Sequence, residues 1–157
     1  MEATVAKSEY EIERGKPMPS RNHAFVQSKI VKIFDRKYGE QFDVISELSL
    51  KLGDTERVPD IVVYKNFDFR PGNDEVKVTE IPLIVMEILS PKQILADLIA
   101  KSYDYFEAGV KSYWLVLPDL TSIYVFSEPG EYEVFAKKGM LHDAQLDIKL
   151  KLEDIFK

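Results

Sequence analysis

The chain has 157 residues, of which 45% are hydrophobic and 31% charged, and its formal net charge is −6. A chain of this length usually forms one domain, so we expect residues 1–157 to be a single domain with a packed core. Cysteine is absent, which excludes disulfides, zinc–thiolate sites, iron–sulfur clusters and cysteine nucleophiles. The acidic charge excludes a nonspecific polycation that coats nucleic acid, but a local basic patch or a carboxylate-bound metal would still allow phosphate binding.

The N-terminal segment is charged and lacks the apolar run of a signal peptide. The longest apolar stretch, residues 81–89, is far shorter than the ~20 residues of a membrane span. We therefore expect a cytoplasmic protein without membrane contact.

A helix is predicted over residues 20–38, because apolar side chains recur there at helical spacing. Ser20 or Asn22 can cap it and Gly39 can end it. The apolar stripe consists of Val26, Ile30, Ile33 and Phe34. A second stripe beside it is basic and consists of Lys29, Lys32 and Arg36. Such a stripe is usually a solvated helix face, but it is also a candidate for contacts with a nucleic-acid backbone.

The middle of the chain predicts strands at residues 44–51, 58–64 and 81–89, the last being the nearly continuous apolar run of a central strand. A second helix is predicted over 92–108. Strands are predicted at 112–117, 122–126, 131–136 and 147–152, and a short closing helix is predicted at 152–157. This order predicts the α/β (α+β) class, with a mixed sheet flanked by helices.

Two carboxylates lie in apolar strand sequences: Asp60 in VPDIVVY and Glu87 in IVMEILSP. A buried carboxylate needs a cation, which can be Lys, Arg or a metal. Converging carboxylates with an open coordination position suit Mg²⁺ or Mn²⁺. The alternatives are a buried ion pair or a strand end for Glu87, and a turn or cap residue for Asp60. Glu47 by itself is better explained as a solvated strand residue.

The order of these motifs resembles the Uma2 family (the DUF820 group) of the PD-(D/E)xK nuclease superfamily. The strongest matching blocks are Pro59–Val63, Val85–Pro91, and the later series Asp97…Lys101…Tyr105…Ala108-Gly109-Val110…Tyr113–Val116. Tyr10-Glu11-Ile12…Gly15 and His23 ahead of an apolar helix also fit, so the resemblance extends from about Glu9 to the end of the chain. For His23 alone, a hydrogen-bonded residue at the helix start is the simpler interpretation.

The resemblance implies a restriction-endonuclease-like fold and Mg²⁺- or Mn²⁺-dependent DNA cleavage. It implies Asp60 and Glu87 as catalytic metal ligands, with Glu47 as a third ligand. The lysine that usually follows the Glu by two residues is absent, because Leu89 stands there. Lys101 matches the helix lysine of the Uma2 pattern, and Lys92 is its rival for the active-site role.

Three alternatives stay open at this point. Lys101 can form an ordinary surface ion pair with Asp97, one helical turn earlier. The chain can be a noncatalytic nucleic-acid-binding or assembly module on a nuclease scaffold, or a structural homodimer with internally paired carboxylates.

We expect a homodimer that contacts the DNA backbone through Lys29, Lys32, Arg36 and Lys92.

Overall fold

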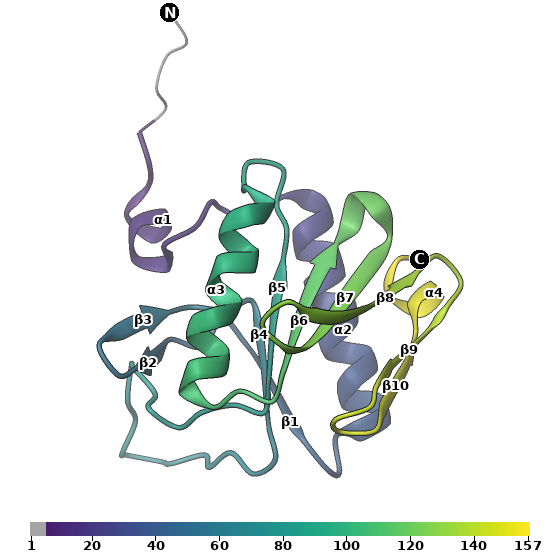
Figure 1. The fold of residues 1–157 in the computed structure, drawn as a ribbon. Helices are drawn as coiled ribbons and strands as arrows, with labels where there is room; N and C mark the ends of the chain where they lie inside the picture. Colours follow the sequence, from purple (N-terminus) through teal and green to yellow (C-terminus); the bar gives the residue numbers. More distant parts are fainter. Residues whose placement is uncertain (1–5) are drawn as a thin grey trace, which may run out of the picture.

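A mixed sheet of six strands forms the centre of the computed structural model, which describes residues 6–157 (Figure 1). The strand order is β1-β4-β5-β6-β7-β8. These strands are β1 (Asp43–Ser46), β4 (Ile61–Tyr64), β5 (Ile84–Ile88), β6 (Ser112–Leu117), β7 (Ser122–Glu128) and β8 (Glu131–Ala136). Strands β5 and β6 are parallel, and the other neighbouring pairs are antiparallel. The expected fold class is confirmed.

Helices cover both faces of this sheet (Figure 1). One face packs against α2 (Arg21–Tyr38), α4 (Leu152–Ile155) and the hairpin of β9 (Met140–Asp143) and β10 (Ile148–Lys151). The other face packs against α3 (Leu95–Ala108) and the hairpin of β2 (Leu50–Leu52) and β3 (Thr55–Arg57). A short helix, α1 (Glu9–Arg14), precedes α2, and a 3₁₀ turn, η1 (Pro118–Leu120), joins β6 to β7. No helix within residues 6–157 is both long and apolar enough to cross a membrane.

Strand β5 is the central strand that the sequence predicts, because all five of its residues are buried. Successive side chains of a strand point to opposite faces of the sheet. Met86 and Ile88 therefore pack on the α2 side, and Val85 packs on the α3 side. The same alternation places Glu87 on the α3 side.

Helix α2 forms as predicted. The Ser20 side chain accepts a hydrogen bond from the backbone N–H of His23 at 3.2 Å, which caps the helix start. Val26, Ile30 and Phe34 are buried against the sheet. The helix therefore carries His23 on its first turn, at the same end as the cap.

The single strand predicted over residues 44–51 is wrong, because the chain turns at Glu47, whose φ is +56°. Residues before this turn form β1 and pair with β4, whereas residues after it form β2 and pair with β3. Alternating hydrophobicity continues through the turn, so the pattern could not reveal it. The sequence patterns also did not reveal α1, β3 and β9.

Candidate active site

Asp60 and Glu87 lie opposite each other at one end of β4 and β5. The antiparallel register pairs Ile61 with Met86, and one further step along both strands sets Asp60 against Glu87. Both residues are inaccessible, with 0% and 1% of their surface exposed. The backbone N–H of Ile88 donates to Oδ2 of Asp60 at 2.7 Å, which fixes this carboxylate beside the neighbouring strand.

A lysine from the N-terminal segment bridges the two acids. Nζ of Lys16 lies 2.7 Å from Oδ1 of Asp60 and 3.3 Å from Oε2 of Glu87. The Lys16 side chain is itself buried. The two carboxylates therefore converge on a single cationic group. This arrangement also agrees with the alternative interpretation of Glu87 as a member of a buried ion pair.

Two more donors complete the surroundings of Asp60. Nη2 of Arg14 lies 2.9 Å from Oδ1, and Nε2 of His23 lies 3.0 Å from Oδ2. The remaining oxygen of Glu87, Oε1, accepts a hydrogen bond from the Tyr105 hydroxyl at 3.0 Å. Asp60 is thus surrounded by more donors than Glu87.

This difference separates the pKa values of the two acids. Burial opposes ionisation of Asp60, but the His23 hydrogen bond and the Lys16 charge outweigh it and lower the Asp60 pKa. Burial dominates at Glu87 and raises its pKa, against the opposing influence of Lys16. Burial also disfavours the charged form of Lys16, but the charges of Glu87 and Asp60 raise its pKa. Pairs of titratable groups with separated pKa values are typical of acid–base sites.

The expected third carboxylate, Glu47, does not join this pair. Arg14 binds it through two hydrogen bonds, Nε to Oε2 at 2.9 Å and Nη2 to Oε1 at 2.7 Å. Gln27 also donates to Oε1 of Glu47, at 3.2 Å. Among residues 6–157, no three His, Cys, Asp or Glu side chains come together as a metal-binding group. The turn at Glu47 accounts for this, because it carries the side chain to the guanidinium.

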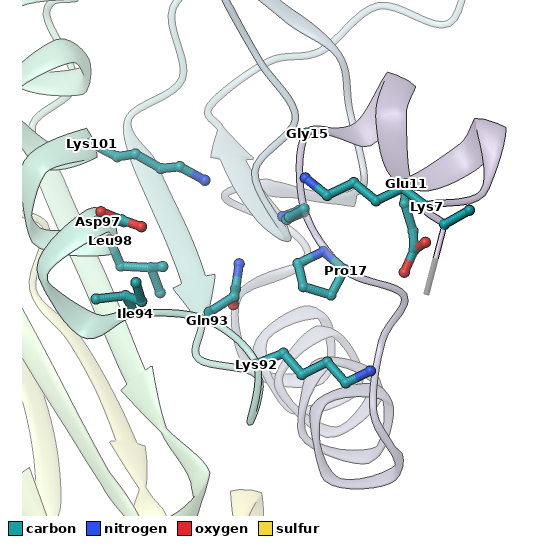
Figure 2. Close-up of a pocket in the computed structure, with 12 residues that line it drawn as sticks. Lys7, Glu11, Gly15, Pro17, Lys92, Gln93, Ile94, Asp97, Leu98 and Lys101 are labelled. Carbon is teal, nitrogen blue, oxygen red and sulfur yellow. The ribbon is translucent and has the colours of Figure 1, made fainter. Parts of the chain in front are cut away.

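The two candidate lysines line a cavity of about 420 Å³ between the N-terminal segment and α3 (Figure 2). Lys101 extends from α3 toward that segment, and Lys92 lies on the loop before α3 (Figure 2). Among the described residues, Lys101 forms no ion pair with Asp97. The Lys101 charge instead opposes the rise in the Glu87 pKa, although burial outweighs it.

The basic stripe on α2 lies elsewhere. Lys29, Lys32 and Arg36 belong to the helix on the other side of the sheet from α3, and none of them lines the cavity that contains Lys101. Lys29 lies over the ring of Phe25, 5.5 Å from its centroid. Contacts of this stripe with DNA stay a prediction.

Sequence reasoning missed Arg14 and Lys16, the two cations at the acids. One signal was available: Ser8 and Glu11 have the spacing of a capping box, which predicts a helix that ends near these residues. The structure contains this capping box. The capping-box spacing alone could not show where the side chains of Arg14 and Lys16 point. That direction depends on long-range contacts, such as the one between Lys16 and Glu87, which are 71 positions apart.

The residues present fit a divalent metal. Mg²⁺ is typically held by one or two carboxylates and keeps several waters for a phosphate substrate. Asp60 and Glu87 supply two such carboxylates, directed at one position by strand pairing and by fixed hydrogen bonds. Glu47 is not required for this donor set.

Comparisons with known proteins identify the family and a similar fold. A structurally similar protein is described as the crystal structure of a putative nuclease belonging to DUF820 from Anabaena variabilis, with a TM-score of 0.77 and 26% sequence identity over 89% of this chain and 83% of that chain. A search of curated proteins found no significant match. The model of the Uma2 family, described as "Putative restriction endonuclease", matches residues 7–150. The chain therefore belongs to the Uma2 family.

Proposed function

We propose that this protein is a DNA endonuclease that depends on Mg²⁺ or Mn²⁺, with Asp60 and Glu87 as metal ligands. The observation that carries the proposal is the convergence of two buried carboxylates on one cation position, in a chain of a nuclease-like family. A metal bound there would lower the pKa of its water and neutralise charge that develops on the phosphate.

The protein's own residues orient the acids for this role. Ile88 and His23 hold Oδ2 of Asp60 from two directions. Tyr105 holds Oε1 of Glu87 and leaves Oε2 directed toward the cation position. Fixed carboxylates lose little freedom when a ligand binds, which is the physical basis of preorganisation.

Lys101 is the best placed candidate for contact with the substrate. It lines the same cavity as Lys16, and its charge acts on Glu87. Hydrolysis forms a bond from a water oxygen to phosphorus and breaks the bond to one sugar oxygen, which takes up a proton. In the proposed reaction, Lys101 donates a hydrogen bond to a phosphate oxygen as negative charge accumulates there.

DNA cleavage by the purified chain tests the proposal. Supercoiled and linear DNA are incubated with Mg²⁺ or Mn²⁺, with chelator as the blank. We expect metal-dependent cleavage that Glu87→Gln abolishes and that Glu107→Gln, a matched change at an exposed position of α3, preserves. Cleavage that survives Glu87→Gln would show that the assigned site is wrong.

A second candidate function is a noncatalytic nucleic-acid-binding module. The favouring observation is that Lys16 already pairs with both acids, while Leu89 replaces the usual lysine. Calorimetry with Mn²⁺ separates the candidates, because the module needs no metal at Asp60 and Glu87. Homodimerisation stays a prediction from the sequence, and light scattering coupled to size-exclusion chromatography tests it.

A further inference from the structure

The short helix α1 is attached to the rest of the protein mainly by charge. Of its residues only Arg14 is buried, whereas Tyr10 and Ile12 are 46% and 66% exposed. In Figure 1, α1 lies at the periphery, outside the layers that cover the sheet. Arg14 and Lys16, on either side of Gly15, reach the acidic groups of the site. The attachment of this segment therefore depends on the same carboxylates as the proposed metal.

The N-terminal segment also lies between two cavities. The cavity of about 420 Å³ and a second one of about 510 Å³ are both lined by Gly15 and by Lys101. Neither cavity is lined by Asp60 or Glu87, which are covered by the cations of the segment. Lys16 lines the first of these cavities and contacts both acids, so the segment lies between that cavity and the acids.

Lys16 and a metal would compete for the same atoms. The Lys16 ammonium contacts Oδ1 of Asp60 and Oε2 of Glu87, the pair of oxygens that converge on one position. An ammonium and a divalent ion cannot both occupy that position, because they repel each other and share the same lone pairs. Binding of one group must therefore remove the other.

We propose that residues 9–17 form an autoinhibitory strap whose Lys16 occupies the metal position, so that metal binding and strap closure exclude each other. This inference rests on the proposed function, because it takes Asp60 and Glu87 as the metal ligands. In the closed state the acids are neutralised and shielded from DNA. In the metal-bound state Lys16 and Arg14 leave Asp60, and the strap is released from the acids.

Calorimetric titration of the full chain with Mn²⁺ alone tests the strap. We expect Lys16→Met to bind Mn²⁺ about tenfold to a hundredfold more tightly than the wild type, since hydrogen bonds to charged groups contribute at this level. Lys138→Met is the matched control, because Lys138 is exposed, lines neither cavity and carries the same charge. Its Mn²⁺ affinity should equal that of the wild type.

The outcomes separate the two proposals. Equal, measurable Mn²⁺ affinity in the wild type and Lys16→Met overturns the strap and leaves the proposed function standing. Absence of Mn²⁺ binding in all three proteins overturns both.

Hydrogen exchange of the wild type gives an answer that does not depend on the folding of a variant. The backbone N–H groups of Ile12 and Gly15 donate to the carbonyls of Ser8, the N-cap of α1, and Glu11. We expect saturating Mn²⁺ to accelerate exchange at these amides at least tenfold, while residues 30–34 of α2 stay protected. Unchanged or slower exchange at Ile12 and Gly15 with Mn²⁺ bound would overturn the strap.

Discussion

Asp60 and Glu87 face each other across β4 and β5, yet the protein moves their pKa values in opposite directions. The donors around Asp60 stabilise its charged form, whereas burial without equivalent donors destabilises the charged form of Glu87. Each shift links protonation to folding stability, so the two acids have opposite effects on the pH dependence of unfolding.

Asp60→Asn should destabilise the protein at neutral pH. It should also reduce the pH dependence of the free energy of unfolding at acidic pH. The folded pKa of Asp60 lies below the unfolded value of ~3.9, so its contribution is complete above that value and is lost as pH falls toward the folded pKa. Breaking a buried ion pair typically costs about 3–5 kcal/mol. Urea unfolding between pH 7 and pH 2 measures this, and a variant with the same pH dependence below pH 4 as the wild type would contradict the assignment.

Glu87→Gln should have the reverse pH dependence. The folded pKa of Glu87 lies above the unfolded value of ~4.3, so its ionisation costs stability as pH rises toward the folded pKa. Relative to the wild type, the variant should therefore gain stability between pH 4 and pH 7, by ~1 kcal/mol as for a typical single substitution. Thermal unfolding at both pH values provides the measurement. A variant that loses relative stability over this range would show that Glu87 is stabilising when charged.

Tyr105→Phe removes the hydroxyl that donates to Oε1 of Glu87. We expect a loss of about 1–3 kcal/mol in the free energy of unfolding, because a hydrogen bond to a buried acidic group disappears. Tyr103→Phe is the control on the same helix, since Tyr103 is 57% exposed, and it should change stability by less than ~0.5 kcal/mol. Equal effects of the two changes in urea unfolding would contradict the role of the Tyr105 hydroxyl.

Lys101→Met and Lys92→Met should affect different kinetic parameters of DNA cleavage. Lys101 acts electrostatically on Glu87, so its loss should lower kcat by about tenfold or more. Lys92 is exposed at the rim of the same cavity, so its loss should raise KM and reduce the salt dependence of DNA binding. A kcat loss confined to Lys92→Met would reverse the two assignments.

The sequence could predict the parts of this site that depend on local pattern. The apolar run around Glu87 predicts a central strand, and Asp60 falls in a second apolar strand sequence, whereas the shared site of the two acids is an implication of the resemblance to the Uma2 family. Strand register then brings the acids together. The cation between them could not be predicted in this way, because Lys16 reaches Glu87 across a separation of 71 positions.

The position of Glu47 could not be predicted for a different reason. Its backbone adopts a left-handed conformation, with φ of +56°, in the middle of an alternating pattern. That conformation is uncommon for residues other than glycine and leaves no trace in hydrophobic periodicity. The carboxylate consequently pairs with Arg14, and the expected set of three acids is not assembled in this arrangement.

The most direct test of a metal site at Asp60 and Glu87 is the anomalous scattering of a Mn²⁺-soaked crystal. We expect one strong peak between the two carboxylates, ~2.0–2.2 Å from an oxygen of each, as for small divalent ions bound to oxygen, with the Lys16 ammonium displaced from that position. A peak elsewhere, or a Lys16 that still bridges both acids at saturating Mn²⁺, would contradict it.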